Sequence, residues 1–345
     1  MVRKILTALL ALGPLVIILD HVGAGDLTIF ALAAAALIPL AWLIGEATEH
    51  AAHHTGPGVG GFLNATFGNA PELIIALLAV NEGLTDVVRG SLIGSVVGNL
   101  LLVLGFSLFF GGRGPLDRES SFVSMGLVGL AVALFLIPSI PGWSGDPERD
   151  SLARVSIPVS IALLVVYVVV TVLALRRHRA MHVSDEAVEM AGWSLGFSLM
   201  VLGAATVVTA FVAEALVGSL QAFADKAGLS EFFVSAVIVA IVGNAAEHGG
   251  AVVVAAKGNI KLAAEIALSS SAQVAVFLIP AVALVSWAID PLALSFRPVE
   301  IAALGAAVLF TAVVLWAGRS SRFRGELLIA AYVAAAVGFF IAGDR

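Results

Sequence analysis

Long apolar runs separated by short polar segments make up most of the sequence. A helix that crosses a lipid bilayer needs roughly 17–25 mostly apolar residues, and runs of this kind recur along the whole chain. About eleven of them are predicted as transmembrane helices, near residues 5–22, 27–47, 60–81, 87–110, 120–138, 153–175, 192–220, 232–256, 260–288, 296–318 and 324–342. We therefore predict an all-α polytopic membrane protein with no separate soluble domain.

The composition supports this prediction. Of the 345 residues, 60% are hydrophobic and 12% are charged, whereas a soluble domain has about 45–50% apolar and about 25% charged residues. The net charge of −6 is modest, and the chain has no basic block typical of a nucleic-acid-binding protein. It has no cysteine, which excludes disulfides and thiolate metal sites.

The first 25 residues allow two interpretations. Arg3 and Lys4 precede an apolar run that ends near small residues at 23–25, as in a cleavable signal peptide. The helix count instead favours an uncleaved first transmembrane helix. With the N-terminus in the cytoplasm, 12 of the 18 basic residues fall on the inner side, as the positive-inside rule requires. We expect a prokaryotic plasma membrane protein whose N-terminus is cytoplasmic and whose C-terminus is outside.

A duplicated motif divides the chain. Gly-Asn-Ala-Pro-Glu at residues 68–72 recurs as Gly-Asn-Ala-Ala-Glu at residues 243–247, displaced by 175 positions. In each half a second acid precedes the motif, and a serine-containing patch begins 22 residues after the motif glutamate. These flanking polar residues are Glu46, Ser95 and Asn99 in the first half, and Glu214, Ser269, Ser270 and Gln273 in the second.

The duplication predicts a first helix within 1–25, five-helix repeats at 26–175 and 192–345, and a cytoplasmic linker at 176–191. Because five is odd, the second repeat crosses the membrane in the opposite sense. Such inverted repeats are recurrent in secondary transporters, whose substrates bind on broken helices near the midplane of the bilayer.

Glu72 and Glu247 are the strongest candidates for function. A charged side chain at the centre of a membrane helix costs about 2.5–3.5 kcal/mol on insertion scales. A single buried glutamate could be protonated and serve helix packing, but two in matching motifs favour a shared binding site. Two carboxylates in a medium of low dielectric constant repel each other, and either a divalent cation or protons relieve the repulsion. Competition of the cation and protons for one site leads to exchange if the protein changes between its inward and outward forms only when the site is occupied. This last step is a hypothesis.

The residues around the glutamates complete an oxygen-rich ligand set. Gly68 and Pro71 are expected to break the helix and free backbone carbonyl groups, and Gly243 matches Gly68 in the second half. Asn69 and Asn244 add side-chain amide oxygens. Such a hard ligand set suits Ca²⁺, although Mg²⁺ and Mn²⁺ also take oxygen ligands.

Other polar residues carry weaker predictions. Glu46 and Glu214 could relay protons or gate the cavity, or lie solvated at helix ends. Glu265 is at most accessory. The cluster of His50, His53 and His54 could bind a transition metal or sense pH, although a solvated polar surface is the favoured interpretation.

At the two motifs the sequence resembles the Ca²⁺/cation antiporter superfamily, and more narrowly its cation/proton exchanger branch. The similarity extends over residues 63–74, 94–105, 243–248 and 270–273 and covers nearly the whole chain. It implies eleven helices, Ca²⁺ binding and proton exchange at Glu72 and Glu247, and a site lined by Asn69, Asn244, Ser95, Ser270 and Gln273. The Na⁺/Ca²⁺ exchanger branch usually has Gly-Thr-Ser in place of Gly-Asn-Ala, which favours protons over sodium. Ser269 and Glu265 depart from the family pattern.

The leading hypothesis is a Ca²⁺/H⁺ antiporter, with Ca²⁺ and H⁺ as its transported ions, the lipid bilayer as its surroundings and no cofactor. Exchange of Na⁺ for Ca²⁺, or of another divalent cation such as Mn²⁺, is the first alternative. An intramembrane metalloenzyme that uses the histidine cluster and a non-transporting scaffold are less favoured. The sequence leaves the oligomeric state open, a homo-oligomer included.

Overall fold

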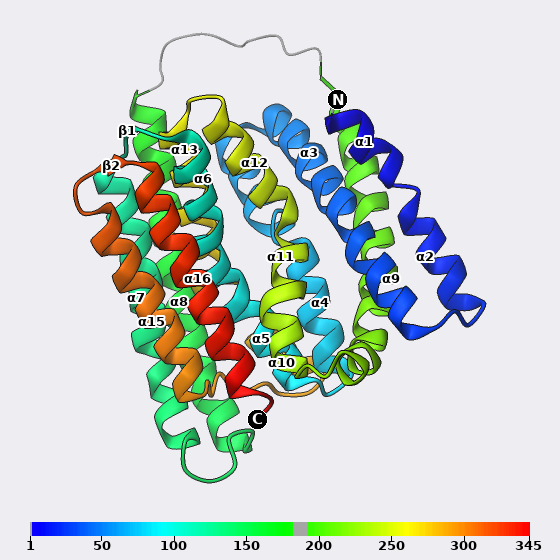
Figure 1. The fold of residues 1–345 in the computed structure, drawn as a ribbon. Helices are drawn as coiled ribbons and strands as arrows, with labels where there is room; N and C mark the ends of the chain where they lie inside the picture. The colour runs from blue at the N-terminus through cyan, green and yellow to red at the C-terminus, as the bar shows by residue number, and fades with distance from the viewer. Residues whose placement is uncertain (1, 182–191) are drawn as a thin grey trace.

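The computed structural model describes residues 2–181 and 192–345, and helices dominate this part of the chain (Figure 1). In the first half, the elements are α1 (Val2–Leu9), α2 (Leu12–His21), α3 (Asp26–Phe67), α4 (Ala70–Asn81), α5 (Thr85–Val97), the π-helical segment η1 (Gly98–Val103), α6 (Leu104–Gly111), the short strand β1 (Gly114–Pro115), α7 (Arg118–Gly142) and α8 (Asp150–Met181).

The second half repeats this order with small changes. Its elements are α9 (Leu195–Ala227), α10 (Glu231–Phe233), the π-helical segment η2 (Val234–Val239), α11 (Ala240–Gly243), α12 (Ala245–Ala256), α13 (Ile260–Gln273), the π-helical segment η3 (Val274–Leu278), α14 (Ile279–Val285), the 3₁₀ turn η4 (Ser286–Ala288), α15 (Pro298–Leu315), β2 (Arg319–Ser320) and α16 (Arg322–Ala342).

The predicted all-α membrane class is confirmed, whereas the exact count of eleven helices is not. Within the described residues, nine helices are long and apolar enough to cross a bilayer, or ten if the bent pair Glu231–Gly243 and Glu247–Ala256 forms one span. The segment predicted at 60–81 is divided between the end of α3 and the short helix α4. No loop separates residues 47 and 60, because backbone groups in a bilayer must find partners within the chain and helical bonds provide them.

The two halves share element boundaries and run in opposite senses. α4 begins at Ala70 and α12 at Ala245, and each has 12 residues. In Figure 1, α4 runs downward from the middle of the molecule towards α5, whereas α12 runs upward towards α13. These features support the predicted repeats at 26–175 and 192–345, whose boundaries stay a prediction. Residues 176–181 of the predicted linker continue α8, and residues 182–191 lie outside the described part.

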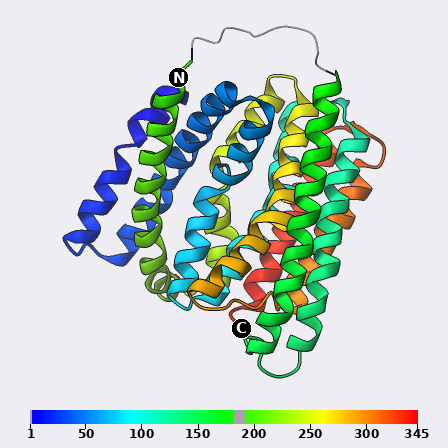
Figure 2. The ribbon, with the colours of Figure 1, turned by 180° about the vertical axis from the view of Figure 1, so that it is seen from behind.

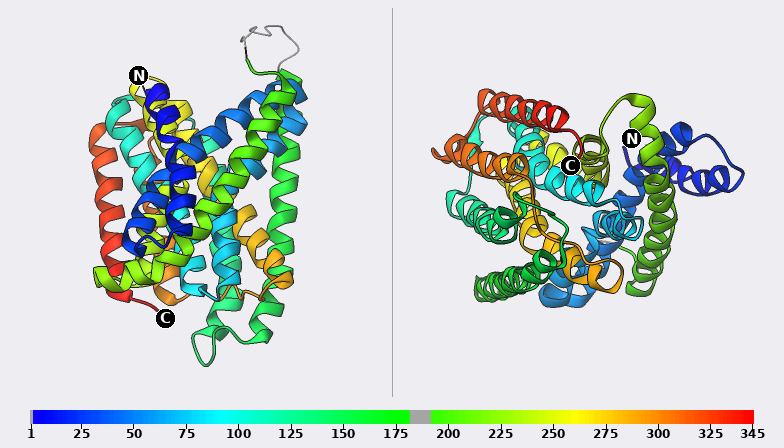
Figure 3. Two further views of the ribbon diagram at one scale, coloured as in Figure 1. Left: turned by 90° about the vertical axis from the view of Figure 1, so that its right-hand side faces the viewer. Right: turned by 90° about the horizontal axis from the view of Figure 1, so that it is seen from below.

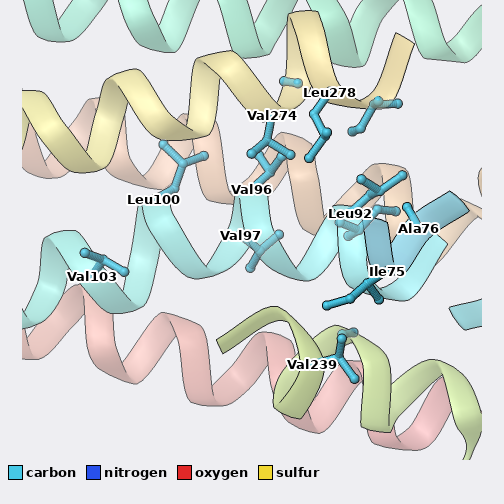
Figure 4. Close-up of a cluster of buried hydrophobic side chains, with 14 of the residues drawn as sticks. Ile75, Ala76, Leu92, Val96, Val97, Leu100, Val103, Val239, Val274 and Leu278 are labelled. Carbon is cyan, nitrogen blue, oxygen red and sulfur yellow. The ribbon is translucent and has the colours of Figure 1, made fainter. Parts of the chain in front are cut away.

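The helices that carry the two motifs, α4 and α12, lie between two groups of outer helices. Viewed from below, α7, α8, α15 and α16 lie on one side, and α1–α3 with α9 lie on the other (Figure 3). From behind, α8 runs along α14, its packing partner (Figure 2). Apolar side chains of α4, α5 and the three π-helical segments form the core between these groups. The labelled members in Figure 4 include Ile75, Leu92, Leu100, Val239 and Leu278.

The C-terminus and the loop between α7 and α8 lie at the lower end of the molecule (Figure 1), and charged side chains of these segments pair with one another and with Arg89 of α5. Arg89 is only 2% exposed, forms an ion pair with Glu148, and has a second carboxylate partner in Asp86 at 3.3 Å. Arg345 lies 3.6 Å from the same Glu148 carboxylate. A buried guanidinium needs such partners, because an unpaired charge in a protein interior is very costly.

Candidate cation-binding site

Two helix breaks form the frame of the site. α3 ends at Phe67 and α4 begins at Ala70, and the intervening Asn69 has φ −102° and ψ 17°. The second break has nearly the same geometry, with φ −90° and ψ 7° at Asn244 between α11 and α12. Pro71 lies in the first turn of α4, where proline starts a helix without losing a hydrogen bond. The predicted interruption beside Asn69 is confirmed, and the second motif has its own.

Each break places its glutamate in the first turn of the following helix. Glu72 lies in the first turn of α4 and is 6% exposed, and half-buried Glu247 lies in the first turn of α12. The positive end of the helix dipole favours a carboxylate at such a position. The two glutamates thus occupy the same position at the start of two half-helices, one from each half of the chain.

Gly243 leaves the space that Glu72 fills. A Cβ atom built on Gly243 would lie 3.3 Å from Cγ of Glu72 and 3.7 Å from its carboxyl carbon. The backbone of the second motif therefore lies beside the carboxylate of the first. The predicted pairing of the two motifs agrees with this geometry, although their role as ligands stays a prediction.

Polar side chains of the two halves bond to one another around the breaks. Asn244 Nδ2 donates to Ser95 Oγ at 2.8 Å. Asn99 Nδ2 donates to Ser270 Oγ at 3.0 Å and approaches Asn244 Oδ1 at 3.4 Å. Ser270 Oγ in turn donates to a carboxylate oxygen of Glu247. This chain of hydrogen bonds joins α5 and η1 of the first half to α12 and α13 of the second.

A second cross-link joins the first motif to the end of α13. Asn69 Nδ2 donates to Gln273 Oε1 at 3.4 Å. Four of the flanking polar residues therefore hydrogen-bond to a residue of one of the two motifs: Ser95, Asn99, Ser270 and Gln273. Of the six residues predicted to line or gate the cavity, the structure bonds these four to the motifs, whereas Glu46 and Glu214 make other contacts or are exposed.

Two buried oxygens at the site make no hydrogen bond to another described residue. Within the described part of the chain, no donor lies within hydrogen-bonding distance of Glu72 Oε2 or Asn99 Oδ1. An unmet buried acceptor costs about 1–3 kcal/mol, and a bound cation or proton would remove this cost. The donor set consists of oxygens, as Ca²⁺ requires. Asn99, predicted only to line the cavity, is thus a further candidate ligand.

Glu46, Glu214 and Ser269 do not take part in the hydrogen bonds described above. Glu46 forms an ion pair with Arg3, and Glu214 is exposed on α9. Their predicted relay or gating role stays a prediction, and neither shows a contact with the motif glutamates. Ser269 is exposed and donates to the carbonyl of Ile266, whereas Ser270 is buried.

The histidine cluster packs against a tryptophan. The ring of His50 stacks on Trp193 with centroids 4.9 Å apart, and Nε2 of His54 lies 2.8 Å from the Trp193 carbonyl oxygen. His53 is exposed. In residues 2–181 and 192–345, no three His, Cys, Asp or Glu side chains are grouped as metal ligands. The contacts therefore favour a packing role for His50 and His54.

Paired carboxylates at the breaks of oppositely directed half-helices define a polytopic membrane transporter. The profile of the sodium/calcium exchanger protein family matches residues 26–176 and 197–341, and the chain belongs to this family. The predicted resemblance to cation antiporters is therefore confirmed.

Individual relatives agree with this assignment. The Ca²⁺/H⁺ antiporter ChaA of Bacillus subtilis is 40% identical over 324 residues, which cover 91% of this chain and 92% of that protein. The Ca²⁺/H⁺ antiporter of Synechocystis is 37% identical over 361 residues, covering 98% and 97%. The solved structure of native YfkE is similar with a TM-score of 0.84 and 36% identity, covering 97% of this chain and 99% of that one. Since these named relatives are antiporters, the prediction of a transporter rather than an enzyme is confirmed.

Proposed function

We propose that this protein exchanges Ca²⁺ for H⁺ across a membrane and that Glu72 and Glu247 bind either the cation or protons. The observation that carries the proposal is the close approach of the second helix break, at Gly243, to the carboxylate of Glu72 at the first break. Oxygen-bearing side chains from both halves, Glu247 among them, bond to one another around these breaks. The choice of Ca²⁺ and H⁺ rests on the named activity of relatives that are 37–40% identical over nearly the whole chain.

The site chemistry explains why the two ions would compete. Without a cation, two buried carboxylates repel each other, and protons remove that repulsion. Ca²⁺ neutralises both carboxylates at once and takes six to eight oxygen ligands. We propose that the carbonyl groups of Gly68 and Gly243 and the amide oxygens of Asn69 and Asn244 supply further ligands. An amide oxygen has two lone pairs, so Asn244 Oδ1 can accept from Asn99 and still face the cation.

The distribution of basic residues supports an orientation. The N-terminus and the β1–β2 turns lie at the upper end in Figure 1, and the C-terminus lies at the lower end. The upper end carries Arg113, Arg319, Arg322 and Arg324 in these turns and at the start of α16. By the positive-inside rule, we propose that this end faces the cytoplasm, in the plasma membrane of a prokaryote.

The proposed exchange can be measured in everted membrane vesicles that contain the protein and a pH-sensitive dye. After the lumen has been acidified, addition of Ca²⁺ without Na⁺ should raise the luminal pH, because Ca²⁺ entry is coupled to proton exit. Vesicles without the protein provide the background. Absence of a response until Na⁺ is supplied would contradict proton exchange, and a response to Mn²⁺ but not Ca²⁺ would contradict the proposed cation.

Ser270→Ala is expected to weaken Ca²⁺ activation of exchange without abolishing it. The change removes the hydroxyl that donates to Glu247 and accepts from Asn99. A hydrogen bond to a charged group contributes about 1.5 kcal/mol, and its loss corresponds to a roughly tenfold higher half-maximal Ca²⁺ concentration. The matched control is Ser269→Ala, whose hydroxyl is exposed. Equal shifts in the two variants would contradict the role of Ser270.

A further inference from the structure

A basic pocket lies at the upper end of the molecule, away from the carboxylate site. The strands β1 and β2 pair antiparallel there, with Gly114 opposite Ser320 and Pro115 opposite Arg319 (Figure 1). They join the turn after α6 to the turn after α15. The cavity that they border has a volume of about 640 Å³ and is lined by Arg113, Gly114, Pro115, Arg319, Ser320, Ser321 and Arg324. Its size falls within the roughly 300–1,000 Å³ typical of small-molecule sites.

The charge of this pocket has one sign. Three arginines and no acidic residue line it. In the described part of the chain, no carboxylate lies within salt-bridge distance of Arg113, Arg319 or Arg324. The nearby carboxylate of Asp117 lies 3.0 Å from Nζ of Lys261 and is already paired. Guanidinium groups bind phosphate oxygens through several donors at once, and a phosphate group is therefore the expected ligand.

The backbone around the pocket is held in place by its own hydrogen bonds. Ser320 Oγ donates to the Gly112 carbonyl at 2.7 Å and reaches the Gly114 carbonyl at 3.2 Å. Arg324 donates through Nη1 to the carbonyl of Arg319, which holds one guanidinium against the second turn. Arg113 and Arg319 are exposed, and their side chains can turn towards a ligand.

Exposed aromatic side chains place the pocket at the level of the lipid headgroups. Phe110 near the end of α6 is 54% exposed, and both Trp316 after α15 and Phe323 at the start of α16 are 66% exposed. The guanidinium of Arg118 lies 5.4 Å from the Trp316 ring. Aromatic side chains collect at membrane–water interfaces, and basic pockets between helices at this depth suit anionic headgroups. A soluble anion has no apolar part that could contact these aromatic side chains, whereas a phospholipid has acyl chains.

We propose that the pocket between the β1 and β2 turns binds the phosphate of an anionic phospholipid headgroup through Arg113, Arg319 and Arg324. The acyl chains then lie along the exposed aromatic side chains of α6 and α16. The lipid bridges the end of α6, which continues the helix that carries Ser95 and Asn99, and the start of α16. This binding site does not depend on which ions the protein transports.

The test is a titration of the purified protein in detergent with phosphatidylglycerol, followed by native mass spectrometry. The double variant Arg113→Gln/Arg319→Gln is expected to bind phosphatidylglycerol roughly 25-fold more weakly, since each of the two basic side chains contributes a factor of about five at a membrane surface. Arg322→Gln is the matched control, because Arg322 lies at the same end but outside the lining. It should bind as the unchanged protein does.

Three results would overturn the proposal. Equal phosphatidylglycerol affinity in the double variant and the Arg322→Gln control would remove the pocket as the site. Equal affinity of the unchanged protein for phosphatidylcholine and phosphatidylglycerol would show that the anionic charge is not recognised. Displacement of the lipid by millimolar inorganic phosphate, with arginine-dependent binding of the phosphate itself, would identify a soluble anion as the occupant. Circular dichroism of the double variant confirms that its helices are intact.

Discussion

Glu72→Gln and Glu247→Gln are each expected to reduce Ca²⁺-dependent proton movement to the level of vesicles without the protein. Glutamine has nearly the shape of glutamate but carries no charge and takes up no proton in this pH range. Loss of one carboxylate leaves half the charge of the cation uncompensated. Two unit charges 4 Å apart interact by about 4 kcal/mol at an effective dielectric constant of 20, which corresponds to roughly a thousandfold in affinity.

The control for both variants is Glu326→Gln, since Glu326 is an exposed acid on α16. It should exchange Ca²⁺ for protons as the unchanged protein does, at equal amounts of protein in the membrane. Ca²⁺ binding adds a second readout: in the unchanged protein it should weaken as the pH falls, because protons occupy the same carboxylates. Normal exchange in both motif variants would reject Glu72 and Glu247 as the ion-binding pair, even if the protein is a Ca²⁺/H⁺ antiporter.

Local sequence signals were sufficient to predict the first helix break, beside Asn69. Glycine at 68 and proline at 71 act on their own segment of chain, and the second motif repeats that segment 175 residues later. Comparison of the two halves at this offset of 175 residues also led to the prediction of Ser95, Asn99, Ser270 and Gln273. All four form hydrogen bonds with the motif residues. A repeated pattern therefore located the candidate site, because equivalent elements in the two halves meet at its centre.

The partners of these side chains could not be predicted, because they depend on how the halves pack. The sequence does not indicate that Asn244 bonds to Ser95 and Asn69 to Gln273. The helical pattern also leaves the rotation of α13 open. Only the family resemblance favours Ser270 over Ser269, and the structure places Ser270 in the network and Ser269 at the surface. Glu46 was placed near the cavity without its partner Arg3, which lies on a helix packed against α3.

Helix continuity was also beyond the local signals. The polar and glycine-rich segment at 48–61 resembles a loop, yet α3 remains helical to Phe67. Arg89 lies within the segment near 87–110 that is predicted as a transmembrane helix, and the structure buries it against Glu148. An arginine within an apolar segment signals a buried ion pair, but the partner comes from a loop about 60 residues away and only the folded chain identifies it.

Gly94→Ala is expected to reduce exchange by about tenfold or more, because α5 has no room for a methyl group at this position. A Cβ atom on Gly94 would lie 2.1 Å from the carbonyl oxygen of Ala236 and 2.7 Å from Cβ of Ala240. The first of these contacts is with backbone, so α5 and η2 must move apart. Overpacking a buried interface costs about 1–3 kcal/mol, and a displacement near 1 Å of functional groups can cost on the order of 100-fold in rate.

The displacement would act on the site through the next residue along the chain. Ser95 accepts the 2.8 Å hydrogen bond from Asn244 that joins the two halves, and a shift of α5 away from η2 would lengthen it. The measurements are the rate of Ca²⁺-dependent luminal alkalinisation and the thermal unfolding midpoint of the purified protein. The rate and the unfolding midpoint should both fall. The rate should fall more steeply, because the polar network around Asn244 is distorted by a smaller shift than the one that unfolds the protein.

Gly98→Ala is the matched control, about one helical turn further along, at the start of η1, which continues α5. Among the described residues, no atom outside the local helix backbone and the two neighbouring residues lies within 4 Å of a Cβ atom built on Gly98, and alanine favours a helix by about 1 kcal/mol over glycine. This variant should keep its exchange rate and unfold at the same or a higher temperature. Similar losses in both variants would show that the helix formed by α5 and η1 tolerates no added side chain for reasons other than the contact of Gly94 with Ala236. Normal exchange in Gly94→Ala would mean that the approach of α5 to η2 does not position the polar network.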